Sequence, residues 1–177
     1  NHPFMRIKAS PSDVPLPPVW ILGSSDYGAR LAAALGLPFS FASHINMAMA
    51  VPAMRLYRES FVPSESLSQP LAMLAVSIIC AATPEEVEDL QRSSDLSMLR
   101  LITGQFGPIP SIEEARAYDF SDLEMEQIQG MRSRRIAGTP DQVLHRITAL
   151  VAETQADELM ISSMVWGHQN RLRALEL

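Results

Sequence analysis

The chain has 177 residues, of which 47% are hydrophobic and 19% charged, a composition typical of one globular domain with a substantial core. Its formal net charge of −6 argues against a nucleic-acid or anionic-membrane partner, because both require a basic surface. The one cysteine cannot form an internal disulfide, and no Cys/His cluster has metal-ligand spacing. We therefore expect no metal site and a cytoplasmic protein.

No apolar run in the sequence approaches the ~20 residues that cross a bilayer, so no membrane span is expected. The first residues, NHPFMRIKAS, lack the apolar core of a signal peptide and do not begin with Met. We expect the sequence to be part of a longer chain.

The first third of the chain alternates between strand and helix patterns. Residues 1–17 contain several prolines and predict an irregular lead-in. The apolar run PVWIL, residues 18–22, predicts a short strand buried on both faces. A helix is expected over 27–35, where Gly36 and Pro38 end it, and a second strand over 38–45.

The alternation continues through the middle of the chain. Residues 46–61 predict a helix whose apolar stripe comprises Ala50, Met54, Tyr57 and Phe61. Residues 71–82, LAMLAVSIICAA, are the clearest strand. A helix follows over 83–100, because Thr83 is a good N-cap, Pro84 suits the first helical position and acidic residues fill the first turn.

Residues 104–138 interrupt this rhythm with glycines, prolines, short polar helical stretches and the basic residues Arg132, Arg134 and Arg135. So long an insertion predicts a mobile loop, such as a lid or a binding loop, or a disordered stretch. Order returns with a helix over 138–154, where Thr139 and Gln142 form a capping box. The last strand is expected within 157–165, and a last helix from 168 onward.

Four strands, each followed by a helix, predict a parallel sheet with right-handed crossovers. Four such units cannot close a (β/α)8 barrel, so the pattern leaves two architectures: a small open α/β sheet or half of a barrel. A free half would expose two parallel edges. We expect another chain, residues 1–17 or further protein to cover them.

The loop between the first strand and the first helix is the candidate binding site. It consists of Gly23, Ser24, Ser25, Asp26, Tyr27 and Gly28. In α/β folds ligands bind at the carboxyl edge of the sheet, and a helix N-terminus with free N–H groups favours a phosphate. Two alternatives stay open at this point: the loop binds an anion, or its small residues only cap the helix. The charge of Asp26 favours the second unless its side chain points away.

Three stretches carry a resemblance to a known family. They are residues 17–45 with LGSS and ALGLPFSFASH, residues 57–90, and residues 138–177 with GTPDQV and ADELMI. In combination and order they resemble the C-terminal half of luciferase-like monooxygenases, which are flavin-dependent (β/α)8 TIM barrels. The resemblance implies a single domain over 1–177 that supplies about four βα units.

The resemblance also implies roles for particular residues. The loop Gly23–Gly28 would hold the FMN phosphate through serine hydroxyls and backbone N–H groups, and residues 104–138 would form the active-site loop. His44 would face the flavin ring as a weak catalytic candidate, although a structural histidine is an equal reading. Arg134 and Arg135 would contact flavin or substrate unless they lie on a solvated loop.

The implied activity is a monooxygenase that oxidises an organic substrate with reduced FMN and O2. A separate flavin reductase would supply the reduced flavin, and the enzyme would be a homodimer. The N-terminal strands that would complete the ring pocket are absent, so the chain alone is expected to be inactive. Two alternatives stay open: a non-catalytic flavin-binding or dimerising protein of the same fold, and a deazaflavin-dependent oxidoreductase.

Overall fold

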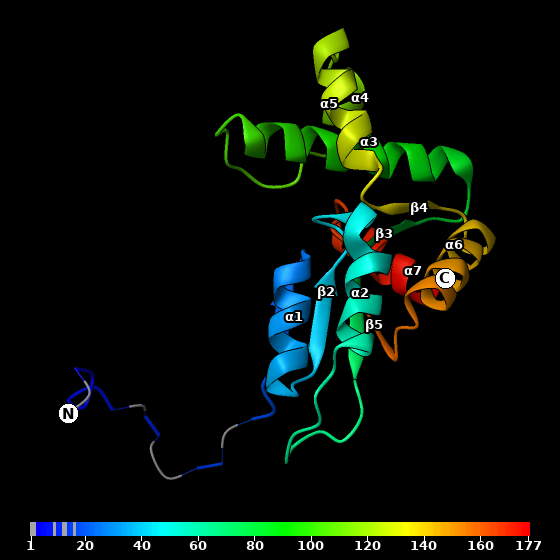
Figure 1. Ribbon diagram of the computed structural model, residues 1–177. Coiled ribbons are helices and arrows are strands. Elements are labelled where there is room, and N and C mark those ends of the chain that lie inside the picture. The colour runs from blue at the N-terminus through cyan, green and yellow to red at the C-terminus, as the bar shows by residue number, and fades with distance from the viewer. Residues whose placement is uncertain (1–2, 9, 12–13, 16) are drawn as a thin grey trace.

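The computed structural model describes residues 3–8, 10–11, 14–15 and 17–177. Within these residues it contains one parallel sheet with helices between the strands (Figure 1). The strands are β1 (Ile21–Gly23), β2 (Phe39–Ala42), β3 (Ala72–Cys80), β4 (Ile136–Gly138) and β5 (Glu158–Ser162). The helices are α1 (Asp26–Leu35), the 3-10 turn η1 (Met47–Met49), α2 (Ala50–Glu59), α3 (Pro84–Ile102), α4 (Ile112–Ala117), α5 (Asp122–Arg132), α6 (Pro140–Thr154) and α7 (His168–Glu176).

The longest strand, β3, organises the sheet. Its first four residues, Ala72–Ala75, pair with all of β2, and Met73–Ser77 pair with β5. Its last three residues, Ile78–Cys80, pair with β4, while β1 pairs only with β2. Every pairing is parallel, as the alternation of strands and helices predicts.

Local sequence signals set the ends of the helices. Gly36 adopts a left-handed conformation (φ 61°) and donates its N–H to carbonyls of the last turn of α1, so that helix ends there. Thr83 caps α3 by accepting the N–H of Glu86 at 3.2 Å. At α6 Thr139 and Gln142 form the expected capping box, in which the Gln142 side chain accepts the N–H of Thr139 at 3.0 Å.

One face of the sheet is covered by α1, α2 and α6. Phe39 and Phe41 of β2 pack with Met54 and Tyr57 of α2 in the main hydrophobic core. The Tyr57 hydroxyl donates to the carbonyl of Leu37 at 2.9 Å and accepts the Leu71 N–H at 3.1 Å. Of the apolar stripe expected on residues 46–61, the three members that lie in α2, Ala50, Met54 and Tyr57, are therefore buried. Burial also raises the pKa of the Tyr57 phenol.

The opposite face and both edges of the sheet carry exposed apolar side chains. Leu22 of β1 is 69% exposed and Met160 of β5 is 53% exposed. The expectation that residues 18–22 form a strand buried on both faces is wrong, because β1 starts only at Ile21 and lies at an edge. β5, at the other side of β3, is exposed along its whole length.

The expectation of four strands is also incomplete, because the insertion contributes β4 together with α4 and α5. Helix α3 does not lie along the sheet as a crossover helix. Figure 1 shows it lying across one end of the sheet with α4 and α5 beside it, while α6 packs alongside the strands. None of the described helices is both long and apolar enough to cross a bilayer.

A buried carboxylate ties the insertion to α3. Asp95 is 1% exposed and accepts the Nε–H of Arg132 at 2.7 Å and an N–H of Arg135. Arg132 also donates to Glu88 at 2.8 Å, and Arg92 donates to the carbonyl of Ala115 at 2.7 Å. These bonds join segments that are far apart in the sequence and fix α4, α5 and the residues before β4 against one helix.

Replacing the buried carboxylate removes the charge that compensates two arginines. We expect Asp95→Asn to lower the free energy of unfolding by ~3 kcal/mol, because breaking a buried ion pair leaves its partners uncompensated. Urea unfolding followed by circular dichroism measures the loss. The matched control is Asp89→Asn, whose partner Arg116 is 64% exposed; it should cost less than ~1 kcal/mol. Equal losses would contradict the role given to Asp95.

That residues 104–138 are mobile stays a prediction. Because α4, α5 and β4 occupy most of this range, we now expect mobility only in the stretch before α4. Residues 104–108 are exposed and belong to no helix or strand, and Phe106 is 81% exposed. Within residues 21–177 we expect chymotrypsin to cleave first after Phe106, because local opening costs least where few apolar contacts hold the backbone. Mass spectrometry of early fragments locates the cut. A first cut inside α4 or α5 would contradict the prediction.

Candidate functional site

A large cavity lies where the carboxyl ends of three strands meet α3 and the insertion. Its volume is ≈ 600 Å³. We call it the strand-end cavity. Ser77 of β3, Ser162 of β5 and His44, just after β2, lie in its wall. This is the edge of a parallel sheet at which α/β proteins bind ligands.

The turn after β2 is held in place by Ser43. This residue is fully buried; its hydroxyl donates to the carbonyl of Ala75 at 2.8 Å, and its N–H donates to the same oxygen at 3.0 Å. The two bonds fix the turn against β3 and leave the next residue, His44, exposed in the cavity wall. The sequence places His44 at the end of the second strand, and in the structure this position lies beside the cavity.

The side of the cavity opposite the strands is apolar. It is formed by one side of α3, by the stretch before α4 and by one residue of α5, through Met98, Leu101, Phe106, Pro108, Ile109 and Met131. Several of these side chains are exposed, among them Leu101 at 51% and Phe106 at 81%. Such a wall suits the apolar body of an organic ligand and excludes water when a ligand fills it.

Three arginines also lie in the wall, and two of them are neutralised from outside it. Arg100 donates to Glu114 at 2.7 Å, and Arg135 is paired with Asp95 and donates to Ser94 at 2.7 Å. Arg134 is exposed. Arg134 and Arg135, the basic residues singled out in the sequence, both lie in the wall of this cavity.

The loop Gly23–Gly28 lies at the carboxyl end of β1, outside the wall of the strand-end cavity. Ser25 occupies the N-cap position of α1, yet its hydroxyl makes no capping hydrogen bond. The serines that precede α4 and α5 do cap, since Ser111 accepts from Glu114 and Ser121 from Glu124. The first N–H groups of α1 and the Ser25 hydroxyl thus stay available to an acceptor.

Two features of this loop answer questions that the sequence raised. A Cβ atom on Gly23 would come within 3.2 Å of the Gly28 Cα, so both glycines allow β1 and the first turn of α1 to touch. Asp26 is exposed and forms an ion pair with Arg30 at 3.5 Å, one turn further along the helix. Its carboxylate therefore lies beside a neighbouring cation, which partly offsets the negative charge at this loop.

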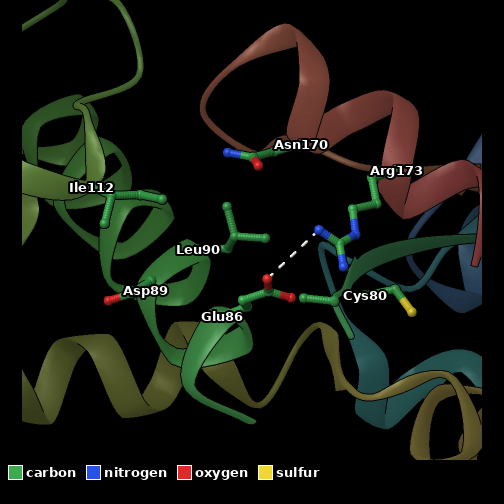
Figure 2. A pocket seen from close by; sticks show the side chains of 8 residues that line it. Cys80, Glu86, Asp89, Leu90, Ile112, Asn170 and Arg173 are labelled. Atoms are coloured by element: carbon green, nitrogen blue, oxygen red, sulfur yellow. Dashed lines mark ion pairs between the residues drawn. The ribbon is translucent and has the colours of Figure 1, made fainter. Parts of the chain in front are cut away.

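A second, smaller cavity of ≈ 160 Å³ lies between α3 and α7. Figure 2 shows Glu86 and Arg173 pointing toward one another across it, with Nη1 and Oε1 3.7 Å apart. Asp89 is engaged by Arg116 at 2.5 Å, and the other Glu86 oxygen accepts the Ala82 N–H at 3.1 Å. Its polar side chains satisfy one another, so this cavity is the weaker candidate for a ligand.

Sequence reasoning found part of this arrangement and missed part. It identified the loop Gly23–Gly28, His44, Arg134 and Arg135, and the structure places the last three together at one cavity. It missed Ser43, Ser77 and Ser162, because small polar residues in strands give no periodic signal. It also missed the apolar wall from α3, since Met98 and Leu101 are indistinguishable in sequence from core residues.

The sequence and the fold match a known family. The sequence model described as luciferase-like monooxygenase matches residues 2–158, and the chain belongs to that family. The expected fold class, an α/β partial barrel of the luciferase-like type, is confirmed. The chain is 38% identical over 172 residues to the Bacillus subtilis protein YvbT, which covers 97% of this chain and 51% of YvbT.

Two further relatives agree. The chain is 39% identical over 160 residues to a luciferase-like monooxygenase of Escherichia coli strain K12, covering 90% of this chain and 48% of that protein. The crystal structure of apo-MsnO8 superposes with a TM-score of 0.83 at 31% identity, over 94% of this chain and 51% of that one. The chain thus spans about half the length of the curated relatives it matches.

The one cysteine lies in the wall of the smaller cavity, and burial raises the pKa of its thiol. At pH 7 the Cys80 thiolate that reacts with thiol reagents is therefore scarcer than in a free cysteine. We expect 5,5′-dithiobis(2-nitrobenzoate) to label the native chain at least tenfold more slowly than the chain in urea. Absorbance at 412 nm follows the reaction, and equal rates would contradict the burial of Cys80.

Proposed function

We propose that the chain supplies the carboxyl-terminal half of an FMN-dependent monooxygenase barrel. The whole enzyme oxidises an organic substrate with reduced FMN and O2, and a separate flavin reductase supplies the reduced flavin. One observation carries the proposal: the strand-end cavity and the uncapped loop Gly23–Gly28 lie at the same, carboxyl edge of one parallel sheet. Membership of the luciferase-like monooxygenase family supports the reaction class.

The residues of the loop fit the phosphate of FMN. Ser24 and Ser25 offer two neutral hydroxyl donors, and the first turn of α1 offers backbone N–H groups and the positive end of the helix dipole. Arg30 pairs with Asp26 and partly offsets the negative charge that a phosphate would meet there. When bound, the flavin supplies the redox chemistry with O2, and the chain supplies binding, orientation and a dry environment.

Residues of the strand-end cavity would surround the flavin ring and the substrate. His44 offers a ring nitrogen as a hydrogen-bond donor or acceptor at the carboxyl end of β2, and Ser77 and Ser162 offer hydroxyls from β3 and β5. Met98, Leu101 and Phe106 exclude water from the same volume. His44 would hydrogen-bond to the bound flavin ring, and we assign no proton transfer to it.

The open edges of the sheet support a missing half. At the β1 edge, Tyr27, Leu31 and Leu35 form an exposed apolar stripe along α1, with Tyr27 73% exposed. At the other edge, β5 exposes Leu159 and Ile161, which align with buried Leu74 and Val76 of β3. Strand edges and apolar stripes of this kind need covering. We propose that a second set of βα units covers both, that the chain alone is inactive, and that the complete enzyme is a homodimer.

The same open edges favour one second candidate, a flavin-binding or dimerising protein without catalysis. Gel filtration monitored at flavin wavelengths, followed by an O2-consumption assay with reduced FMN, separates the two. A dimer that retains flavin without oxygen-dependent product supports the second candidate. Product formation by the chain with its complementary half supports the first.

The phosphate role of the loop predicts a selective loss of affinity. The double substitution Ser24→Ala with Ser25→Ala removes two donors to a charged acceptor, each worth about 1.5–3 kcal/mol. We expect FMN affinity to fall at least about tenfold, since 1.4 kcal/mol is a factor of ten. Riboflavin has no phosphate, and its affinity should not change. Fluorescence titration of both flavins against the full-length enzyme and against its double variant measures the difference.

The matched control is Ser121→Ala, which removes a helix-capping hydroxyl from α5, where it accepts the Glu124 N–H. This variant should bind FMN as the unchanged chain does. An equal loss for both flavins, or a loss for neither, would mean that the two serines only shape the start of α1.

A further inference from the structure

Strand β5 places a carboxylate on the face of the sheet that no helix covers. Side chains alternate between the two faces along a strand. In β5, Ser162 lies in the wall of the strand-end cavity, whereas Leu159 is aligned with Leu74, a residue of the main hydrophobic core beneath the helices. Glu158, four residues before Ser162, therefore lies on the same face as the cavity. We call this side of the sheet, opposite α1, α2 and α6, the open face.

Glu158 is the one charged side chain that strands β1, β2, β3 and β5 place on the open face where they pair. The alignment of these strands assigns the remaining positions to Leu22, Ser40, Ala42, Met73, Ala75, Ser77, Met160 and Ser162. These side chains are mostly apolar. Some are widely exposed, among them Leu22 at 69% and Met160 at 53%. The open face is thus an uncovered apolar surface with a single negative charge.

The neighbours of Glu158 on the open face cannot satisfy its carboxylate. Within the part of the chain that the structure describes, Glu158 is exposed and makes no hydrogen bond and no ion pair. The residue beside it on β3 is Met73, which is apolar. Ser40, the next residue in the same row, lies two strands away, a separation of roughly 10 Å. This distance is beyond the reach of a hydrogen bond from a glutamate side chain.

The arginines of this chain are also placed elsewhere. Arg58 reaches the start of β5 from α2, on the helix-covered face, and donates to Asp157 at 2.6 Å and to the carbonyl of Gln155. The arginines of the strand-end cavity belong to the other end of β5. Ser162 in that wall lies roughly 13 Å from Glu158 along the strand. Glu158 therefore depends on water for its solvation.

That solvation is lost if further strands close the sheet. The chain spans about half the length of the curated relatives it matches. Strand β1 pairs only with β2, and β5 pairs only with β3, so each has one edge available for pairing. Parallel strands added at both edges would convert the open face into a closed interior. A carboxylate buried there without a partner is very costly, whereas a neighbouring cation compensates its charge.

We propose that the βα units that complete the barrel carry an arginine or a lysine that forms an ion pair with Glu158 in the barrel interior. The cation comes from the side of the free edge of β5, because Met73 occupies the other side of Glu158. This inference rests on the proposed function, in which a second set of βα units covers the sheet. It adds the chemistry of that cover, which is apolar against Leu22 and Met160 and basic against Glu158.

The test compares melting temperatures of the full-length enzyme and of the 177-residue chain. Glu158→Gln keeps the shape of the side chain and removes its charge. In the full-length enzyme we expect a fall of at least about 5 °C, because the partner cation stays buried without compensation. In the 177-residue chain Glu158 is exposed and unpaired among the described residues, so the change should be less than about 2 °C.

Two further variants separate the charge from the cover. Glu153→Gln makes the same chemical change at an exposed position of α6, and it should alter neither protein by more than about 2 °C. Met160→Ala tests whether the open face is covered at all. It should lower the melting temperature of the full-length enzyme, where a buried methionine is truncated, and leave the 177-residue chain nearly unchanged, because Met160 is 53% exposed there.

A charge exchange identifies the partner residue. Glu158→Lys puts two positive charges together, and it should destabilise the full-length enzyme more than Glu158→Gln does. In this background, each arginine and lysine on the strands of the other half is replaced by glutamate in turn. We expect one of these replacements to restore most of the lost melting temperature, because it re-forms the pair with opposite signs.

Three results would overturn the inference. The first is a full-length enzyme that Met160→Ala destabilises and Glu158→Gln does not, since the face is then covered and the carboxylate needs no cation. The second is an equal loss from Glu158→Gln in both proteins, which would give Glu158 a role within this chain. The third is no effect of either substitution on the full-length enzyme. Only that third result also removes the covering half from the proposed function, and the flavin titrations of the Ser24 and Ser25 variant test its cofactor separately.

Discussion

The structure depends on the pairing of β3 along both of its edges. This nine-residue strand uses its first residues for β2 and β5 and its last three for β4. Because all three neighbours are parallel to it, their carboxyl ends gather at one edge of the sheet. The turn that carries His44 is anchored to the same strand through Ser43 and Ala75. The strand-end cavity is thus a consequence of β3 being central.

The part of the cavity wall formed by α3 and the insertion depends on a different interaction, the ion pairs of the buried Asp95 with Arg132 and Arg135. A carboxylate that is 1% exposed on α3 must be compensated, and it is compensated by arginines 37 and 40 residues further along the chain. Those arginines fix α5 and the residues before β4 beside α3. The apolar wall and Arg134 are positioned by the same clamp, so the packing of the insertion and the character of the cavity have one physical origin.

The sequence predicted those elements whose signals are local. Thr83 and Pro84 predict the start of α3, Gly36 predicts the end of α1, and the apolar run around Leu74 predicts β3. The capping serines of α4 and α5, Ser111 and Ser121, each stand three residues before a glutamate and could have revealed these helices. β4 has three residues and no pattern to find. Asp95 looks like a solvent-exposed helix residue until its distant partners are known.

The two candidate binding places differ in how they are built along the chain. The loop Gly23–Gly28 is continuous in sequence, so its candidate role could be read from six consecutive residues. The strand-end cavity draws His44, Ser77, Met98, Arg134 and Ser162 from five separate segments, and only the fold brings them together. The two places also differ in chemistry. The loop at the start of α1 offers neutral donors of the kind that bind an anion, whereas the cavity combines strand hydroxyls with an apolar wall from α3 and the insertion, so each place needs a different part of the fold to form.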